Sequence, residues 1–174
     1  MKQVLLSKGS AIVTDVPAPT IESGDILVQV RVSCLSVGTE MSSVKSTGIP
    51  IWKRALQQPD KIISTLNMAK TTGIKRTWSI NEEKRDAAHP TGYSATGVVI
   101  KVGSDITDIV PGDKVACAGA QCAYHAELIR VPRNLCTLLP ETLGWAEAST
   151  VTLGAIAMQG VRRAQPTLGE SFIV

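Results

Sequence analysis

The chain has 174 residues, of which 44% are apolar and 19% charged, and its formal net charge is +3. This composition suits one folded domain of ordinary size and excludes an intrinsically disordered chain, which carries more charge and less apolar material. The sequence holds neither an apolar run of the roughly 18 residues that a membrane span needs nor an N-terminal apolar stretch long enough for a signal peptide, so we expect a cytoplasmic protein with reduced cysteines.

The N-terminal part of the chain is predicted to form strands. A hairpin pattern covers residues 3–13, with a turn at Lys8-Gly9-Ser10. From Ile26 to Ser33, valine or isoleucine occupies every second position. Because successive side chains of a strand point to opposite faces, this period predicts a half-buried strand.

The pattern changes to a helical one after Ile49. Pro59 and Asp60 predict the start of a helix, and Thr71-Thr72-Gly73 predicts its end. A second, shorter helix is predicted over residues 78–86, before Pro90. We therefore expect a helical insertion at about residues 45–88.

Basic residues are concentrated in the same part of the chain. Between Val44 and Arg85, nine Lys and Arg residues accompany three acids, so this segment carries +6 and the rest of the chain −3. A local basic excess favours an anionic partner or substrate, although a solvated helical face explains it as well. Nucleic-acid binding is disfavoured, because Trp52 and Trp78 alone provide aromatic rings for base stacking there.

Strand patterns return in the second half. Strands are predicted over residues 95–102, 114–118, 123–131 and 134–139, with glycine- or proline-containing turns between several of them. Short strands at regular spacing favour a small barrel or sandwich. Residues 145–150 and 154–164 are predicted to be helical, and residues 169–174 look like the opening of a buried strand.

The order of several short motifs resembles the N-terminal, GroES-like domain of medium-chain dehydrogenase/reductases, the superfamily of the zinc-type alcohol dehydrogenases. The motifs are Ser36-Val37-Gly38-Thr39-Glu40, Gly92-Tyr93-Ser94-Ala95-Thr96-Gly97, Val110-Pro111-Gly112-Asp113-Lys114-Val115 and Ala123-Tyr124-His125-Ala126-Glu127. The resemblance implies a mainly β fold with helices (α+β), a GroES-like β-barrel with a helical insertion, over residues 1–145. Residues 146–174 would then be connecting helices and the first strand of a Rossmann domain truncated at the C-terminus.

A narrower resemblance rests on SVGTE, GYSATGVV, VACAGA, VPRNLC and VTLGAIAMQGVR. This combination is similar to bacterial bi-domain oxidoreductases of polysaccharide clusters, which are often labelled threonine dehydrogenase-like. The resemblance implies a zinc-independent NAD(P)-dependent oxidoreductase that acts on an alcohol or carbonyl, with a sugar or nucleotide sugar as the substrate class. In the complete protein it also implies a homo-oligomer.

The zinc ligands of the alcohol dehydrogenases align with Val37 and Tyr93 and fall near Thr152. Valine does not bind zinc, and neutral Tyr and Thr are poor ligands, so we expect no zinc. Cys117, Cys122 and His125 form the competing set, which is disfavoured because strand alternation puts such residues on different faces.

Without zinc, the residues that the resemblance places near substrate and cofactor are the candidates for chemistry. Thr39, Glu40 and Tyr93 are the candidate catalytic residues, as hydroxyl donors and a base. Thr152 and Gln159 are the candidate cofactor-binding residues for NAD or NADP. Alternatively, Thr39 and Glu40 cap the next segment, Tyr93 packs in the core, and Thr152 is structural.

Two readings of the function remain open. In the first, the chain is the substrate-side domain of an oxidoreductase and is inactive by itself, because the sequence contains no G-x-G-x-x-G turn for the phosphates of a dinucleotide. In the second, it is a non-catalytic GroES-like scaffold that docks a partner oxidoreductase domain.

Overall fold

The computed structural model describes residues 1–7, 10–38, 88–171 and 173. The chain divides into two compact units. The first comprises Met1–Gln3, Asp15–Cys34 and Gly92–Val174, and the second Val4–Thr14 and Leu35–Thr91. The helices expected over 59–72 and 78–86 lie outside the described residues.

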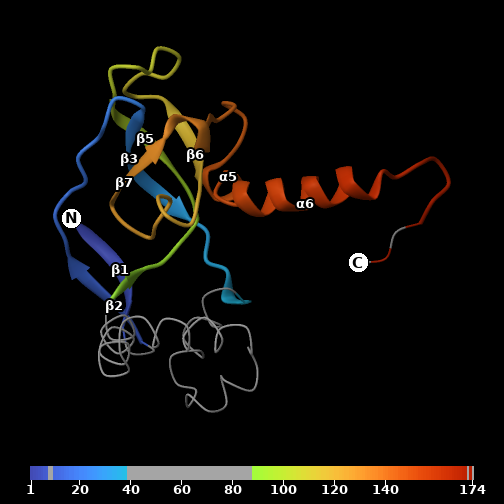
Figure 1. Ribbon diagram of the computed structural model, residues 1–174, viewed down its shortest axis with the longest axis horizontal. Helices are drawn as coiled ribbons and strands as arrows, with labels where there is room; N and C mark the ends of the chain where they lie inside the picture. The colour runs from blue at the N-terminus through green and yellow to red at the C-terminus, as the bar shows by residue number, and fades with distance from the viewer. Residues whose placement is uncertain (8–9, 39–87, 172, 174) are drawn as a thin grey trace, which may run out of the picture. The chain divides into compact units, whose positions relative to one another are not determined.

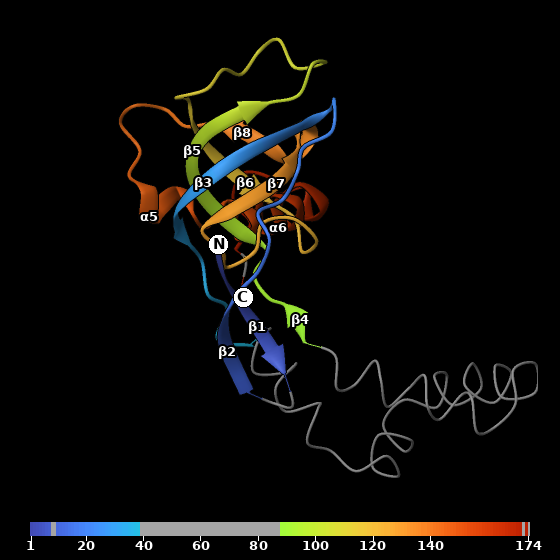
Figure 2. The ribbon, with the colours of Figure 1, turned by 90° about the vertical axis from the view of Figure 1, so that its left-hand side faces the viewer.

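A five-stranded antiparallel sheet forms the centre of the first unit (Figure 1). Its strand order is β7-β3-β5-β6-β8. Its strands are β3 (Asp25–Ser33), β5 (Ser94–Val102), β6 (Lys114–Ala118), β7 (Leu128–Pro132) and β8 (Cys136–Leu138). Figure 2 shows the sheet curling around its buried face. The mainly β fold class expected from the sequence is thereby confirmed.

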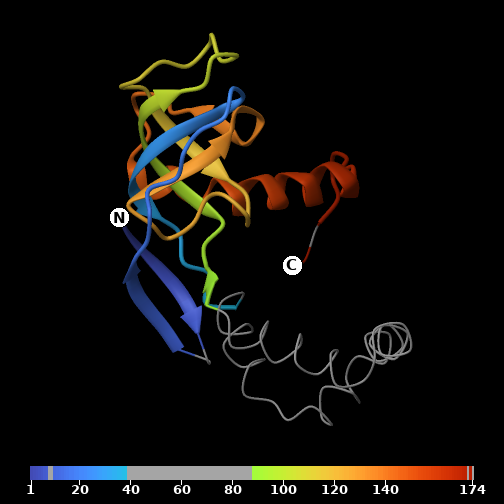
Figure 3. The ribbon, with the colours of Figure 1, turned by 60° about the vertical axis from the view of Figure 1, so that its left-hand side comes forward.

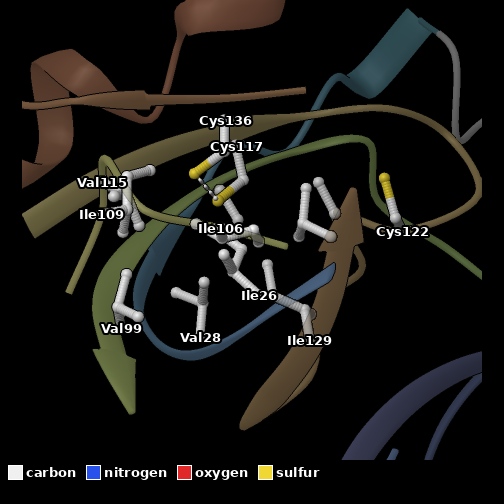
Figure 4. Packing of buried hydrophobic residues seen from close by; sticks show 13 residues of the cluster. Ile26, Val28, Val99, Ile106, Ile109, Val115, Cys117, Cys122, Ile129 and Cys136 are labelled. Atoms are coloured by element: carbon white, nitrogen blue, oxygen red, sulfur yellow. Dashed lines mark hydrogen bonds between the residues drawn. The ribbon is translucent and has the colours of Figure 1, made fainter. Parts of the chain in front are cut away.

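Strand β3 has the two-faced character that its sequence predicts. Ile26 and Val28 are fully buried, whereas Gln29 and Arg31 are exposed. The buried face joins the core of the unit, which is built from small aliphatic residues and thiols (Figure 4). The largest side chains with less than 2% exposure are Ile26, Ile109, Ile129, Val28, Val99, Val115 and Val131.

The pairing of β3 with β5 brings two backbones unusually close at Gly97. Gly97 pairs with Val30, and the register shifts on either side, between Leu27 and Val28 and between Val30 and Val32. Such irregularities bend a strand and increase its twist, in keeping with the curl of this sheet. A Cβ at position 97 would overlap the carbonyl oxygen of Gln29 and lie 2.7 Å from Cγ1 of Val28. Only glycine fits there.

A second, three-stranded sheet has the order β2-β1-β4. Its strands are β1 (Lys2–Ser7), β2 (Ser10–Asp15) and β4 (His89–Pro90). The neighbouring strands β1 and β2 confirm the pairing expected for residues 3–13. Lys8 and Gly9, the first two residues of the expected turn, lie outside the described residues.

Residues 123–127 do not form the strand expected from their apolar pattern. The observed strand β7 begins only at Leu128. Gly119, at φ +128°, starts a turn in which its carbonyl oxygen accepts hydrogen bonds from the N–H groups of Cys122 and Ala123. Beyond this turn, Ala126 makes an isolated bridge with Gln3. The turn takes up backbone groups that a strand would need, so the expectation for 123–131 is wrong in its first half.

The predicted strand over 134–139 is shorter than expected. A 3₁₀ turn, η1 (Arg133–Leu135), occupies its beginning, and β8 follows.

Two helices follow the sheet, α5 (Trp145–Ala148) and α6 (Val151–Ala164). Helix α6 begins three residues before the expected start at Gly154, because the Gly154 N–H already donates to the carbonyl oxygen of Thr150, the residue before the helix. Figure 3 shows α6 beginning beside the sheet, and its residues from Leu153 onward are exposed. No helix within the described ranges is long and apolar enough to cross a membrane.

The last residues lie in no strand. Ser171 and Ile173 are exposed, and Phe172 and Val174 lie outside the described residues. The Rossmann strand expected over 169–174 stays a prediction.

Candidate functional site

Four residues tie the start of β5 to the start of α6. The buried Ser94 hydroxyl donates to the carbonyl oxygen of Ser149 at 2.6 Å and accepts from the N–H of Thr152 at 3.2 Å. The Thr152 hydroxyl donates to the carbonyl oxygen of Tyr93 at 3.0 Å. We call Tyr93, Ser94, Ser149 and Thr152 the β5–α6 junction.

A second hydroxyl on the same face of β5 holds helix α5. The fully buried Thr96 side chain lies 3.0 Å from the carbonyl oxygen of Trp145 and 3.3 Å from that of Val32. Since residues two apart on a strand share a face, Ser94 and Thr96 both point toward the helices. The sequence signal for this contact is the pair of hydroxyl residues at alternate positions of an otherwise apolar strand, and neither residue is among the candidates predicted from the sequence.

Tyr93 is positioned through its backbone. Its carbonyl oxygen accepts hydrogen bonds from the Thr152 hydroxyl and from the N–H of Gly119 at 2.9 Å. Its side chain is half-buried. The junction therefore brings together two of the candidate residues from the sequence, Tyr93 and Thr152. The Thr152 hydroxyl donates its hydrogen bond to a backbone carbonyl oxygen.

The other candidates are placed differently. Gln159 is exposed on α6, two helical turns beyond Thr152. Thr39 and Glu40 lie outside the described residues, so their roles stay predictions. Val37 belongs to the second unit and is exposed.

A buried histidine contacts the end of β3. Nδ1 of His125 lies 2.8 Å from Oγ of Ser33, in a hydrogen bond whose donor depends on the histidine tautomer. Gly92, at φ +102°, packs directly on this residue: a Cβ at position 92 would lie 2.6 Å from the backbone nitrogen of His125. The next residue after Ser33, Cys34, donates its N–H to the carbonyl oxygen of Ser94 at 2.9 Å. The His125 side chain thus holds the C-terminal end of β3, at Ser33.

The competing metal set is not assembled. Within the described parts of the chain, no three His, Cys, Asp or Glu side chains are arranged to hold a metal ion. A hydrogen bond with Cys136 and burial raise the pKa of the Cys117 thiol, and burial raises the pKa of Cys122. Because metals bind the thiolate, raised pKa values disfavour binding at these two sulfurs.

Helix α6 carries Gln159, a candidate cofactor-binding residue, whose role stays a prediction. Gln159 offers an exposed amide, and a Cβ added at Gly154 or Gly160 would meet no atom within 4 Å apart from its chain neighbours and the backbone of its own helix. Helix α6 is therefore open to a neighbouring group. The phosphates of a dinucleotide require a glycine-rich turn, and no two glycines in the sequence are two positions apart. This chain therefore offers no turn of that kind for the phosphates of such a cofactor.

No family model matches the chain. Over 100 residues it is 35% identical to the 2-methylene-furan-3-one reductase of Solanum lycopersicum. Over a segment of 100 residues it is also 32% identical to the chloroplastic NADPH-dependent alkenal/one oxidoreductase of Arabidopsis thaliana. Each match covers 51% of this chain and 26% of the plant protein, so the chain spans about a quarter of the length of these curated relatives.

Solved structures share the fold over nearly the whole chain. The quinone oxidoreductase from Coxiella burnetii superposes with a TM-score of 0.69 and 18% identity, covering 98% of this chain and 47% of that protein. The quinone oxidoreductase of Escherichia coli, complexed with NADPH, superposes with a TM-score of 0.63 and 13% identity, covering 94% and 41%. The chain spans less than half of either structure.

Proposed function

We propose that this chain, which has the fold of the substrate-side domain of medium-chain dehydrogenase/reductases, forms that half of an NAD(P)-dependent oxidoreductase. The observation that carries the proposal is the agreement of two independent likenesses. The fold matches quinone oxidoreductases along the chain, and a segment of 100 residues is 32% identical to an NADPH-dependent oxidoreductase. The whole protein would act in the cytoplasm on a carbonyl, an alcohol or an activated double bond.

The nicotinamide cofactor, when bound, supplies or accepts the hydride. The chain's own residues bind and orient the substrate. Tyr93 donates its phenol hydrogen bond to a substrate oxygen, where negative charge develops as the carbonyl is reduced. The Tyr93 carbonyl oxygen accepts hydrogen bonds from the Thr152 hydroxyl and from the N–H of Gly119, and these two bonds fix the backbone from which the phenol side chain extends.

Zinc independence is part of the proposal, and the donor set supports it. Val37 provides no ligand atom, and the Thr152 hydroxyl already donates to a backbone carbonyl. A tetrahedral zinc site needs three protein ligands of the nitrogen, sulfur or carboxylate type, and these positions offer none. Tyr93 would therefore replace the polarising role that zinc has in the alcohol dehydrogenases.

We further propose an anionic substrate, such as a sugar phosphate or a nucleotide sugar. The support is the charge of +6 on residues 44–85. All of these residues lie outside the described ones, so the proposal rests on charge and on the narrower family resemblance alone.

The natural full-length protein tests these proposals. It should oxidise NADPH or NADH when given an enone, a quinone or a keto sugar, and mass spectrometry should find well under one zinc per chain. Tyr93→Phe should lower kcat by about 100-fold, as expected for the loss of one transition-state donor. Tyr124→Phe is the matched control, because Tyr124 packs against the core, and it should leave kcat unchanged.

Substrate charge is tested in the same assay. Arg54→Glu and Lys61→Glu should raise KM for a nucleotide sugar more than KM for a neutral quinone. Full activity of Tyr93→Phe would remove Tyr93 from the mechanism. Failure of the full-length protein to bind either nicotinamide cofactor would instead support the scaffold reading.

A further inference from the structure

Two core cysteines face each other across neighbouring strands. Cys117 of β6 pairs in register with Cys136 of β8. Their sulfur atoms lie 3.6 Å apart, in a thiol–thiol hydrogen bond. Figure 4 shows the two side chains turned toward one another and Cys122 set apart from them. The cysteines are free thiols.

The hydrogen-bond pattern shows which kind of cross-strand pair they form. The N–H of Leu139 donates to the carbonyl oxygen of Lys114, so these two residues form a hydrogen-bonded pair. In antiparallel strands such pairs alternate with non-hydrogen-bonded pairs. Cys117 and Cys136 lie three steps further along the ladder and therefore form a non-hydrogen-bonded pair.

The backbone spacing of a non-hydrogen-bonded pair allows a disulfide between Cys117 and Cys136. Residues in a non-hydrogen-bonded pair have Cα atoms about 4.5 Å apart, and disulfides span Cα distances of about 4.4–6.8 Å. The strand pairing thus already provides the backbone spacing. Closing the bond requires mainly rotation of the two side chains, to bring the sulfurs to about 2.05 Å.

Access to the pair runs through β8. Cys117 is fully buried, whereas Cys136 is 7% exposed and opens a strand of three residues at the edge of the described sheet. Thr137 and Leu138 are exposed. Short edge strands with few buried contacts open locally at a small free-energy cost, so a small oxidant reaches Cys136 first.

We propose that Cys117 and Cys136 are a redox-responsive site, at which a peroxide closes an intrachain disulfide that ties β8 to β6. The thiolate of Cys136 attacks one peroxide oxygen. The O–O bond breaks, the leaving hydroxide becomes water, and Cys136 becomes a sulfenic acid. The sulfur of Cys117 then attacks that of Cys136: the S–S bond forms, the S–O bond breaks, and a second water leaves with the Cys117 proton. The two thiols lose two electrons, which reduce the peroxide to two waters.

The cross-link has a defined structural consequence. Cys117 lies two residues before Gly119, whose N–H donates to the Tyr93 carbonyl oxygen. The disulfide restrains this end of β6 and closes a loop between β6 and β8. Because closing a loop lowers the entropy of the unfolded chain, the oxidised protein should be the more stable form.

Peptide mapping after hydrogen peroxide treatment tests the proposal. Trypsin releases residues 115–130, which contain Cys117 and Cys122, and residues 134–162, which contain Cys136. In a Cys122→Ser variant, Cys117 is the one cysteine of the first peptide. A serine hydroxyl can donate to the carbonyl oxygens of Ala118 and Gly119 as the Cys122 thiol does. In wild-type protein, fragmentation spectra identify the linked cysteine, so the test does not depend on the variant's folding.

Remaining thiols are blocked with iodoacetamide before digestion. The peptides 115–130 and 134–162 should then appear as one linked species, whose mass is the sum of the two peptide masses minus two hydrogen atoms. Dithiothreitol should reverse the link, and the midpoint of thermal unfolding should rise by several degrees on oxidation. Cys136→Ala should abolish both effects. Unlinked peptides that carry sulfinic acid, a link through Cys34 or Cys122, or disulfides between chains would each overturn the proposal. None of these measurements uses enzymatic activity, so they stand apart from the proposed function.

Discussion

Gly97 lies where the backbones of β5 and β3 approach most closely, and it illustrates what one residue contributes to this fold. A side chain there would overlap the Gln29 backbone, which belongs to a central strand of the sheet and has no room to move. Gly154, on helix α6, has the opposite surroundings: a Cβ would meet no atom within 4 Å apart from its chain neighbours and the backbone of its own helix. The fold therefore requires glycine at position 97 but not at position 154.

Gly97→Ala should destabilise the protein strongly, by about 2 kcal/mol or more, since the overlap must be relieved by separating two paired strands. Gly154→Ala is the matched control and should raise stability by up to about 1 kcal/mol, because alanine favours a helix over glycine. Urea unfolding followed by circular dichroism measures both changes. Equal stability of Gly97→Ala and the wild type would contradict the close approach of β3 and β5.

At the scale of elements, the β5–α6 junction shows how a strand and a helix distant in the sequence are joined. Ser94 uses one hydroxyl for two backbone partners, the carbonyl oxygen of Ser149 and the N–H of Thr152. Both partners lie where the chain passes from α5 into α6, so this buried hydroxyl helps to fix where α6 begins.

Ser94→Ala should cost about 2 kcal/mol or more in the free energy of unfolding, because it leaves buried backbone groups without a partner. Ser104→Ala provides the comparison. The Ser104 hydroxyl bonds the carboxylate of Asp105 at the surface, and its loss should change stability by less than about 0.5 kcal/mol. Hydrogen exchange of the α6 amides should accelerate in Ser94→Ala and not in Ser104→Ala. Unchanged exchange in Ser94→Ala would show that other contacts hold the helix.

At the scale of the whole molecule, apolar residues occur in two settings. The core of the first unit buries side chains such as Ile129, which is 1% exposed. Helix α6 carries apolar side chains that the chain itself does not cover, and Ile156 is 64% exposed. Packing of these exposed side chains against a further domain is an expectation of the proposed function.

Ile129→Ala should lower the free energy of unfolding by about 2–5 kcal/mol through the cavity that it leaves. Ile156→Ala should change it by less than about 0.5 kcal/mol, because no packing is lost and alanine is a good helix former. Chemical unfolding of the isolated chain distinguishes the two. A large loss for Ile156→Ala would mean that α6 is packed within this chain after all.

The sequence by itself determined most elements that have a local signal. The alternation over 26–33 and the apolar runs around 95–102 and 114–118 predicted β3, β5 and β6 within a residue or two, since periodicity and turn residues act over a few positions. The ordered motifs indicated the fold class in the same way. The prediction failed at 123–127, where the turn at Gly119 competes with an apolar pattern that suits a strand equally well.

Only the tertiary structure decided which distant residues meet. The strand order β7-β3-β5-β6-β8, the hydrogen bonds of Ser94 with the α5–α6 connection, the contact of His125 with Ser33 and the pairing of Cys117 with Cys136 all join segments far apart in the chain. Each depends on strand register, and a shift of one residue would turn every side chain of a strand to the other face. The pattern of one strand shows which of its faces is buried, but it does not show which distant strand lies beside it.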